Sequence, residues 1–226
     1  DDFTAEEILQ LEKVHQALTI IQFKLESQLI KRRPEFQMED QVTLDKIDYW
    51  EECLTIDDKK HPLINTCFQT IDPTNPSELS PEEAQAVDSM LASFQESLKL
   101  AEHINLLMKK GSMYKIYNQH LLFHGCIPLE PSGEFQPLMI HQAHYVGREL
   151  LDFFEYHIRQ AAKNKEIGDD FSTDLIWYCW RGKLSPLFGK DKMTTLERYF
   201  IEDKETHKEV ENSYFSYRNS EKICQL

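Results

Sequence analysis

A histidine followed by a glycine at the end of an apolar run has the clearest potential for chemistry in this sequence. The run His120–Phe123 leads directly into His124 and Gly125. We expect a buried strand that ends there, which places the imidazole at the carboxyl edge of a sheet while the glycine lets the backbone turn away. Such an imidazole can ligate a metal or act as a hydrogen-bonded structural group, and the residue types leave both interpretations open.

Lys31, Arg32 and Arg33 form the one dense cluster of positive charge. Three adjacent cations in an acidic chain can bind a phosphate group. They can equally remain solvated and favour the negative end of the helix that they terminate. The cluster is therefore a candidate phosphate site with an ordinary structural alternative.

The segment 189–198 is a second candidate phosphate site. Thr194 and Glu197 have the spacing of a capping box, so a helix N-terminus would face Lys190 and Lys192. Backbone N–H groups, the helix dipole and two ammonium groups together suit a phosphate. The glycine and lysine spacing does not match a Walker A loop, and a capped surface helix with ordinary lysines is the alternative.

Two further patterns are weaker. His141 and His144 are three residues apart and could bind zinc from one helical face, but no nearby cysteine or acid completes the ligand set. The run Trp177–Trp180 could stack on nucleic-acid bases, yet core packing is the better interpretation.

Charge and composition exclude several classes of protein. The chain has 25 Lys and Arg against 39 Asp and Glu, a net charge of −14, which disfavours nucleic acid and anionic membranes as partners. No apolar run approaches the ~20 residues of a membrane span. An odd number of cysteines without a CxxC pair indicates reduced thiols in a cytoplasmic protein: Cys53, Cys67, Cys126, Cys179 and Cys224. The chain lacks an initiator methionine, so we interpret it as an internal piece of a longer protein.

Long helices are expected to position these residues. Thr4 and Glu7 form a capping box that opens the first helix, and Pro34 ends it after Arg33. Apolar residues recur every three or four positions, which predicts one stripe facing a partner. The stripe consists of Leu11, Val14, Leu18, Ile21 and Leu25.

Two more helices follow from the same signals. Ser80 and Glu83 cap a second helix, predicted to run to Lys110 with Gly111 as a left-handed cap. Its predicted apolar side is made of Val87, Leu91, Phe94, Leu98, Ala101 and Met108. Apolar periodicity predicts a third helix over 143–163.

Short β elements and loops separate the helices. The residue pattern predicts a small hairpin over 49–64 and a loop over 71–77. We predict a mainly α fold with a minor β component, in the α+β class. Residues 1–112 would form a helical region with the hairpin, and residues 113–226 the strand with the His-Gly loop and further helices; one continuous domain is the alternative.

The sequence resembles class III fructose-1,6-bisphosphatase, the type found in Firmicutes and Bacteroidetes. The matching segments extend over residues 13–222, and several are long and unusual. They are Ala17–Glu26, Ile30–Phe36, Leu44–Tyr49, Leu121–Leu129, Ser185–Lys190 and Met193–Lys204.

This resemblance implies a manganese-dependent phosphatase of the calcineurin-like metallophosphoesterase superfamily. Such an enzyme removes the 1-phosphate of fructose 1,6-bisphosphate in gluconeogenesis. The fold expected from it is a long-helix insertion packed on a piece of the superfamily's αββα core. Of the five superfamily metal motifs, only His-Gly can be carried over, onto His124 and Gly125, and the others are absent from these 226 residues.

The resemblance strengthens two assignments and leaves one alternative. His124 is expected to ligate a metal in the complete enzyme, where the remaining ligands lie outside this chain. The predicted substrate-binding cations are Lys31, Arg32, Arg33, Lys190, Arg198 and Lys204. No catalytic residue is assigned, and we expect the chain alone to be inactive. The alternative function is a non-catalytic helical scaffold that forms homo-oligomers through its long helices.

Overall fold

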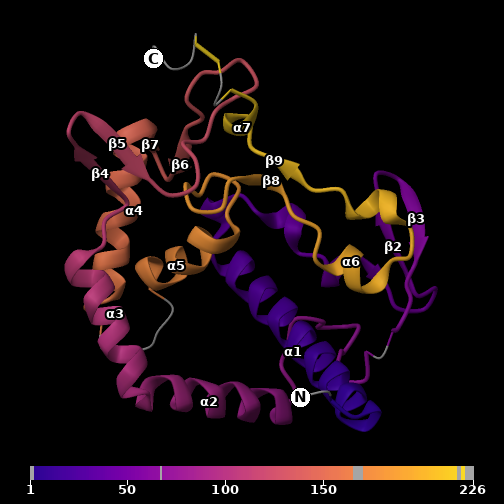
Figure 1. Cartoon of the computed structure of the whole chain (residues 1–226). Helices are drawn as coiled ribbons and strands as arrows, with labels where there is room; N and C mark the ends of the chain where they lie inside the picture. The colour runs from indigo at the N-terminus through magenta and orange to yellow at the C-terminus, as the bar shows by residue number, and fades with distance from the viewer. Residues whose placement is uncertain (1–2, 67, 165–169, 218–219, 222–226) are drawn as a thin grey trace. The chain divides into compact units, whose positions relative to one another are not determined.

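The computed structural model describes residues 3–66, 68–164, 170–217 and 220–221. The chain divides into two compact units, one of Asp1–Glu96 and Leu196–Thr206, the other of Ser97–Thr195 and His207–Leu226. Helices predominate and the strands of the described residues form small antiparallel sheets (Figure 1). The predicted mainly α, α+β class is therefore confirmed, whereas the domain boundary after residue 112 stays a prediction.

The first unit contains α1 and a three-stranded sheet of order β1-β2-β3. Its elements are α1 (Ala5–Arg32), η1 (Pro34–Phe36), η2 (Glu39–Gln41), η3 (Leu44–Lys46), β1 (Ile47–Asp48), β2 (Cys53–Ile56), β3 (Lys59–Pro62), α2 (Pro81–Glu96), α6 (Leu196–Phe200) and the start of η4 (Lys204–His207).

The second unit contains the other helices and three two-stranded ribbons. Its elements are α3 (Leu98–Lys110), β4 (Tyr114–Tyr117), β5 (His120–Phe123), β6 (Leu138–Ile140), β7 (Ala143–Tyr145), α4 (Gly147–Ala161), α5 (Phe171–Arg181), β8 (Lys190–Lys192), β9 (Val210–Glu211) and α7 (Tyr214–Tyr217).

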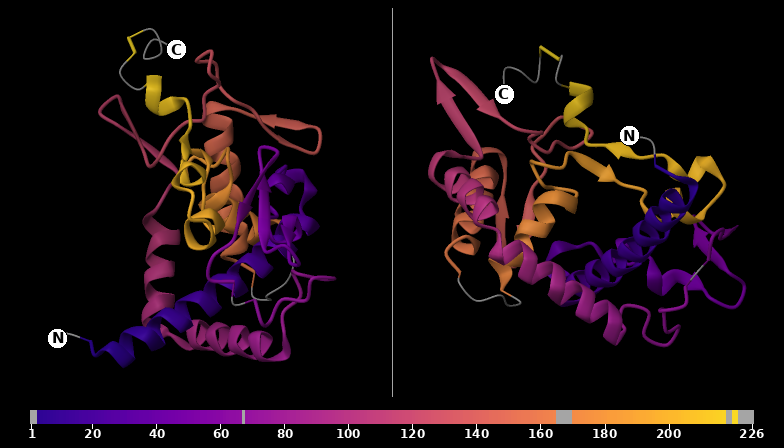
Figure 2. Two further views of the ribbon diagram at one scale, coloured as in Figure 1. Left: turned by 90° about the vertical axis from the view of Figure 1, so that its right-hand side faces the viewer. Right: turned by 60° about the horizontal axis from the view of Figure 1, so that its bottom comes forward.

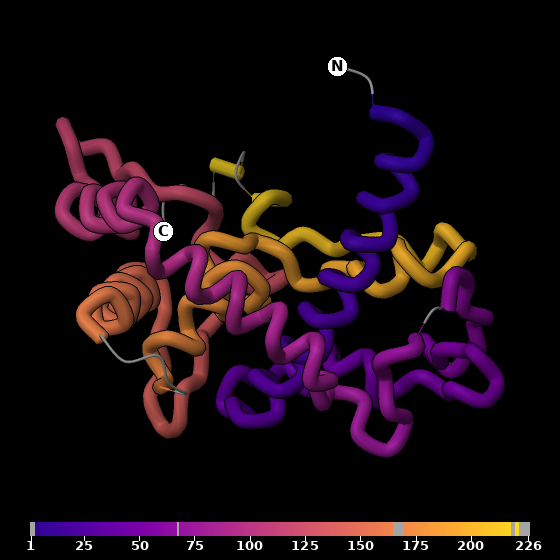
Figure 3. Tube along the Cα trace, turned by 90° about the horizontal axis from the view of Figure 1, so that it is seen from below, coloured from indigo at the N-terminus to yellow at the C-terminus, as the bar shows by residue number. Residues whose placement is uncertain are grey.

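The predicted limits of α1 are confirmed, but its packed face is not the predicted stripe. Thr4 and Glu7 form the capping box, and η1 begins at Pro34. Leu11, Val14 and Leu18 are 53%, 46% and 40% exposed. The first turns of α1 project beyond the rest of their unit (Figures 2 and 3), so that only its second half is covered. Spacing identifies an apolar face, but neighbouring segments decide which face is buried.

The core of the first unit joins segments that are distant in the sequence. The 57–58 turn, in which both residues have positive φ, connects β2 and β3 as the hairpin prediction required. The segment 196–206 returns beside this hairpin (Figure 1), where Leu63 bridges Ile201. The core residues are Ile20, Phe23, Leu44, Ile47, Leu54, Leu63, Ile71, Leu196, Phe200 and Ile201.

The prediction of one continuous second helix is wrong. Ser80 and Glu83 form the expected capping box, but α2 ends at Glu96 and α3 begins at Leu98. Ser97 separates the two because its hydroxyl accepts a hydrogen bond from the Leu100 amide and so caps a new helix. Gly111 has φ −74° rather than a left-handed conformation, which corrects the predicted cap.

Two predictions for the second unit also need correction. The third helix begins at Gly147, not at 143, because 143–145 pair with β6 as β7. The strand His120–Phe123 exists as β5, but it pairs with β4 in an exposed ribbon and is not buried. The core lies instead between α4 and α5, where the rings of Phe154 and Tyr178 stack at 6.1 Å.

Candidate metal-ligand loop

His124 lies directly after β5, on a loop that is held in place by its neighbours. Its side chain is exposed to solvent. The next residue, Gly125, has φ +84°, and a Cβ there would lie 2.1 Å from the carbonyl oxygen of Pro186. The Cys126 amide then donates to that same oxygen at 2.8 Å. Glycine is therefore required at position 125, and the loop presents the imidazole outward from a fixed backbone.

The segment that contacts this loop is itself held by hydrogen bonds of a buried serine. The buried hydroxyl of Ser185 donates to the Cys179 carbonyl of α5 at 2.6 Å, and accepts from the Leu187 amide at 3.1 Å. Gly189, at φ +69°, packs its Cα side against the Phe215 ring and the Cys126 sulfur. The loop of His124 is thus connected to α5 and α7 through the short turn 182–189.

Cys126 is the thiol nearest to the candidate ligand in the sequence, but it is not suited to metal binding. Its side chain is fully buried. Burial, with a smaller effect of the Asp191 carboxylate, raises the pKa of the Cys126 thiol to about 12. Since the thiolate is the form that binds metals, Cys126 is a packing residue at neutral pH. Cys53, Cys126 and Cys179 are free and buried, whereas Cys67 and Cys224 lie outside the described residues.

Asn212 connects the loop to the β8–β9 ribbon. Its carbonyl oxygen accepts from the amides of Leu129 and Tyr214, both at 3.0 Å. Its amide nitrogen donates to Asp191 at 3.0 Å and to Gln136 at 3.3 Å. A 1%-exposed asparagine with four partners is a structural hub. Sequence reasoning missed it, because three of the four partners are more than 20 residues away along the chain and no local pattern marks it.

Replacing Gly125 by alanine is expected to destabilise the chain by about 2–4 kcal/mol, because a positive φ is combined with a backbone collision. The matched control is Gly147→Ala. Gly147 also has positive φ, +51°, but its nearest neighbour would be a Phe135 ring carbon at 3.7 Å. That control should cost only about 1 kcal/mol. Equal losses in urea denaturation would show that the approach to Pro186 is not the reason for the glycine.

The predicted cationic cluster lies at the end of α1, in the first unit. Lys31 forms an ion pair with Asp45 at 2.8 Å and donates to the Ser77 hydroxyl at 3.2 Å. Arg33 faces Glu35 at 3.8 Å. Lys31 and Arg33 already have acidic or hydroxyl partners, and the Arg33 side chain is only 17% exposed, so it is not fully solvated as the structural alternative assumed. Phosphate binding by Lys31, Arg32 and Arg33 stays a prediction.

The other predicted cations belong to different units. Lys190 lies on β8 in the second unit and is ion-paired with Glu209. Arg198 on α6 and Lys204 in η4 lie in the first unit, and both side chains are exposed. Thr194 is fully buried and donates to the His207 carbonyl at 2.9 Å, so it is tied to the chain rather than open to a ligand. The substrate roles of Lys190, Arg198 and Lys204 also stay predictions.

The premise of the histidine pair is wrong. His141 occupies the turn after β6 with φ +54°, and His144 lies on β7 opposite Met139. They therefore do not share a helical face. The core packing predicted for the aromatic run Trp177–Trp180 holds for Tyr178 and Cys179, which are buried, but not for Trp180, which is 54% exposed.

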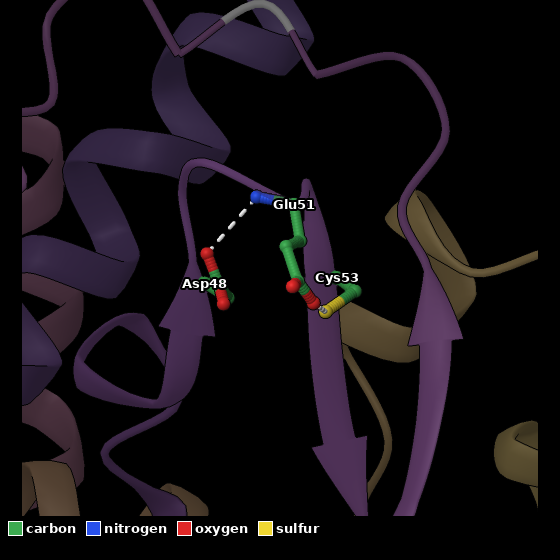
Figure 4. A group of neighbouring side chains, drawn as sticks. All are labelled: Asp48, Glu51 and Cys53. Carbon is green, nitrogen blue, oxygen red and sulfur yellow. Dashed lines mark hydrogen bonds between the residues drawn. The ribbon is translucent and has the colours of Figure 1, made fainter.

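Within the described ranges, Asp48, Glu51 and Cys53 bring three potential metal-ligand atoms within 4.8 Å of one another (Figure 4). Each has a simpler explanation. Asp48 accepts from the backbone amide of Glu51 at 2.9 Å and so closes the turn between β1 and β2. Glu51 forms an ion pair with Lys60, and its carboxylate also accepts a hydrogen bond from the Cys53 thiol. We interpret the group as a hydrogen-bonded turn.

The fold is thus mixed α+β, with an outward-facing imidazole held on a glycine loop and cations dispersed over both units. The model of the family described as Firmicute fructose-1,6-bisphosphatase matches residues 1–226, so the chain belongs to this family. That finding confirms the resemblance drawn from the sequence motifs. No helix among the described residues is long and apolar enough to cross a bilayer.

Curated relatives give the same result. "Fructose-1,6-bisphosphatase class 3" of Streptococcus gordonii is 99% identical over 225 residues, which are 100% of this chain and 35% of that protein. The protein of the same name from Streptococcus sanguinis is 84% identical over 225 residues, again 35% of its length. The one from Staphylococcus epidermidis is 54% identical over 215 residues, 95% of this chain and 33% of that protein. The chain therefore spans about a third of the length of these relatives, and no solved structure matches it.

Proposed function

We propose that this chain forms part of a metal-dependent phosphatase that hydrolyses the 1-phosphate of fructose 1,6-bisphosphate in cytoplasmic gluconeogenesis. The observation that carries the proposal is the family match over all 226 residues, together with the placement of His124 on a fixed, outward-facing loop. Manganese is the proposed cofactor, and fructose 1,6-bisphosphate the substrate.

The residues present suit one corner of a metal site. His124 is exposed, and within the described ranges it belongs to no cluster of three metal-ligating side chains. As a neutral imidazole it would supply one ring nitrogen to a metal, and its other nitrogen would need a hydrogen-bond acceptor. One imidazole cannot hold a catalytic centre, so the remaining ligands would come from the part of the full-length protein outside this chain.

When bound, a pair of divalent metals lowers the pKa of a water and neutralises charge that develops on the phosphoryl oxygens. The chain's own contribution is positional. Gly125 and the Cys126 amide fix the backbone on either side of the imidazole's attachment point, so that little conformational entropy is lost on binding. A bisphosphate also requires cations beyond the metals, for which Lys31, Arg32, Arg33, Lys190, Arg198 and Lys204 are the proposed sources.

We expect the isolated 226-residue chain to release no phosphate from fructose 1,6-bisphosphate and to bind manganese only weakly, while the full-length Streptococcus gordonii relative does both. The test is a phosphate-release assay on both proteins, with and without a chelator, and manganese titration by calorimetry. Turnover by the chain alone would contradict the proposed division of ligands. Full activity of the relative after chelation would contradict the metal requirement.

A second candidate function is a homo-oligomerisation module, favoured by the exposed apolar stripe of α1, to which other exposed apolar residues such as Ile8 and Leu9 would have to add contact area. Leu11, Val14 and Leu18 alternate at spacings of three and four, which is the pattern of a helix–helix seam. If two copies pair through it, the sedimentation coefficient should rise with concentration, and Leu18→Glu should abolish that rise. A chain that stays monomeric at 100 times its lowest assay concentration would exclude this function.

A further inference from the structure

Helix α3 is amphipathic, yet the second unit leaves it uncovered. Leu100, Ile104 and Leu107 recur at spacings of four and three and therefore share one face, with Lys99 and Glu102 on the other. These three apolar side chains are 36%, 44% and 57% exposed, and none of the 13 residues of the helix is buried. A helix of this length is marginal in water unless its apolar face is packed against something.

The C-terminal end of α3 is nevertheless firmly attached. Arg159 of α4 donates to the Met108 carbonyl at 2.6 Å and to the Gly111 carbonyl at 2.9 Å. Glu155, one turn earlier on α4, pairs with Arg159 at 2.7 Å and accepts from the Met113 amide at 2.9 Å. This arrangement fixes the end of the helix and hence the orientation of its apolar face within the unit. A fixed, unpacked apolar face is characteristic of a docking surface.

We propose that the face of Leu100, Ile104 and Leu107 docks against the part of the full-length polypeptide that lies outside these 226 residues. That part exists in the relative, of which this chain covers 35%. The size of the face argues against a second copy as its occupant. A 13-residue helix is roughly 20 Å long and 10 Å wide, so one face offers about 200 Å². Stable association of separate chains needs about 600 Å² or more from each partner. A covalently linked segment needs less contact, because its effective concentration is in the millimolar range.

The test uses two adjacent leucines of α3 with nearly equal exposure. Leu106 is 58% exposed and lies on the polar side of the helix, whereas Leu107 is 57% exposed and lies on the apolar face. In the 226-residue chain, Leu106→Lys and Leu107→Lys should change the melting temperature equally and slightly. In the full-length Streptococcus gordonii relative, the substitution at the aligned Leu107 should lower it by about 5 °C or more, and that at Leu106 by about 1 °C. If the lysine variant does not fold, Leu107→Ala should show the same order of effects.

Hydrogen exchange provides an independent measurement on the unmodified proteins. The amides of α3 should exchange roughly 100-fold more slowly in the full-length relative than in the 226-residue chain. Equal exchange in the two proteins, or equal sensitivity to the two substitutions in the relative, would overturn the proposal. Protection that appears in the 226-residue chain as its concentration is raised would also overturn it, because a second copy would then be the occupant.

Discussion

Replacing His124 by alanine in the full-length relative is expected to lower kcat by on the order of 100-fold or more, since a metal ligand would be lost from the centre that acts on the phosphate. The helical circular-dichroism signal should not change, because the side chain is exposed and the loop is held by Gly125 and Cys126 instead. Manganese bound per mole of protein should fall in parallel with activity. The measurements are steady-state phosphate release and metal analysis of the same samples.

The matched control is His120→Ala. His120 is an exposed histidine four residues earlier, at the start of β5, where it pairs with Tyr117. Removing it takes away an imidazole of similar exposure from the same strand, so any general effect of histidine loss would appear in both variants. Unchanged kcat and unchanged manganese content in His124→Ala would refute the assignment of the metal ligand. An equal loss in both variants would point to the strand rather than to coordination.

Local signals predicted the parts of the fold that depend on local chemistry. The start of α1 follows from a capping box between Thr4 and Glu7, and the β2–β3 turn from the polar residues 57–58. In each case the stabilising partners lie within a few residues, so the sequence contains the whole interaction. The break at Ser97 is also local, but serine occurs often inside helices, and an apolar pattern that continued past it favoured one long helix.

Burial could not be predicted in the same way. The stripe of α1 and the strand β5 both have the apolar pattern of packed elements, yet Leu11 and Leu121 are 53% and 47% exposed. Periodicity tells which residues of an element share a face, and the rest of the fold determines whether that face is covered.

In the candidate site, too, local sequence signals identified some residues and missed those whose partners are distant. His124 and Gly125 were found because a family motif and a backbone requirement coincide on adjacent residues. Asn212 was not found, because three of its four partners, Leu129, Gln136 and Asp191, are distant in the sequence and an isolated asparagine has no distinctive context. Lys24 is the clearest such case: nothing in the pattern of α1 marks a lysine as fully buried, and its partner Glu83 lies 59 residues further along.

The loss of this buried charge pair is the second large effect that we expect. The ammonium group of Lys24 is completely inaccessible and donates to the Glu83 carboxylate at 2.7 Å and to the Thr70 carbonyl at 2.5 Å. Glu83 also accepts from the Ser80 amide, so one carboxylate both caps α2 and joins it to α1. Lys24→Met fills similar space but leaves Glu83 charged, buried and without its cation. Urea denaturation at pH 7 should show a loss of about 3–5 kcal/mol.

Lys31→Met is the matched control, because that lysine pairs with Asp45 in a position where both side chains are about 40% exposed. Surface pairs of this kind contribute little, so its loss should stay within about 0.5 kcal/mol. Equal effects of the two substitutions would contradict the buried role of Lys24. The double variant Lys24→Met/Glu83→Gln should recover part of the loss, because the amide removes the unpaired charge while keeping the contact with Ser80.

The pH dependence of the unfolding free energy provides a second test of the Lys24–Glu83 pair. Burial by itself would raise the pKa of Glu83, but hydrogen bonds from Lys24, Thr70 and Ser80 outweigh it and lower that pKa below 4.5. A carboxyl group with a lowered pKa in the folded state stabilises the fold above its unfolded pKa, and this stabilisation is lost as the pH falls through the folded value. In Lys24→Met the largest opposing hydrogen bond is gone, so burial should raise the pKa of Glu83 instead. The difference in unfolding free energy between the wild-type chain and Lys24→Met should therefore shrink as the pH is lowered from 7 toward 4, where a neutral Glu83 no longer needs its cation. A difference that stays constant over this range would mean that lost packing, and not the unpaired charge, destabilises the variant.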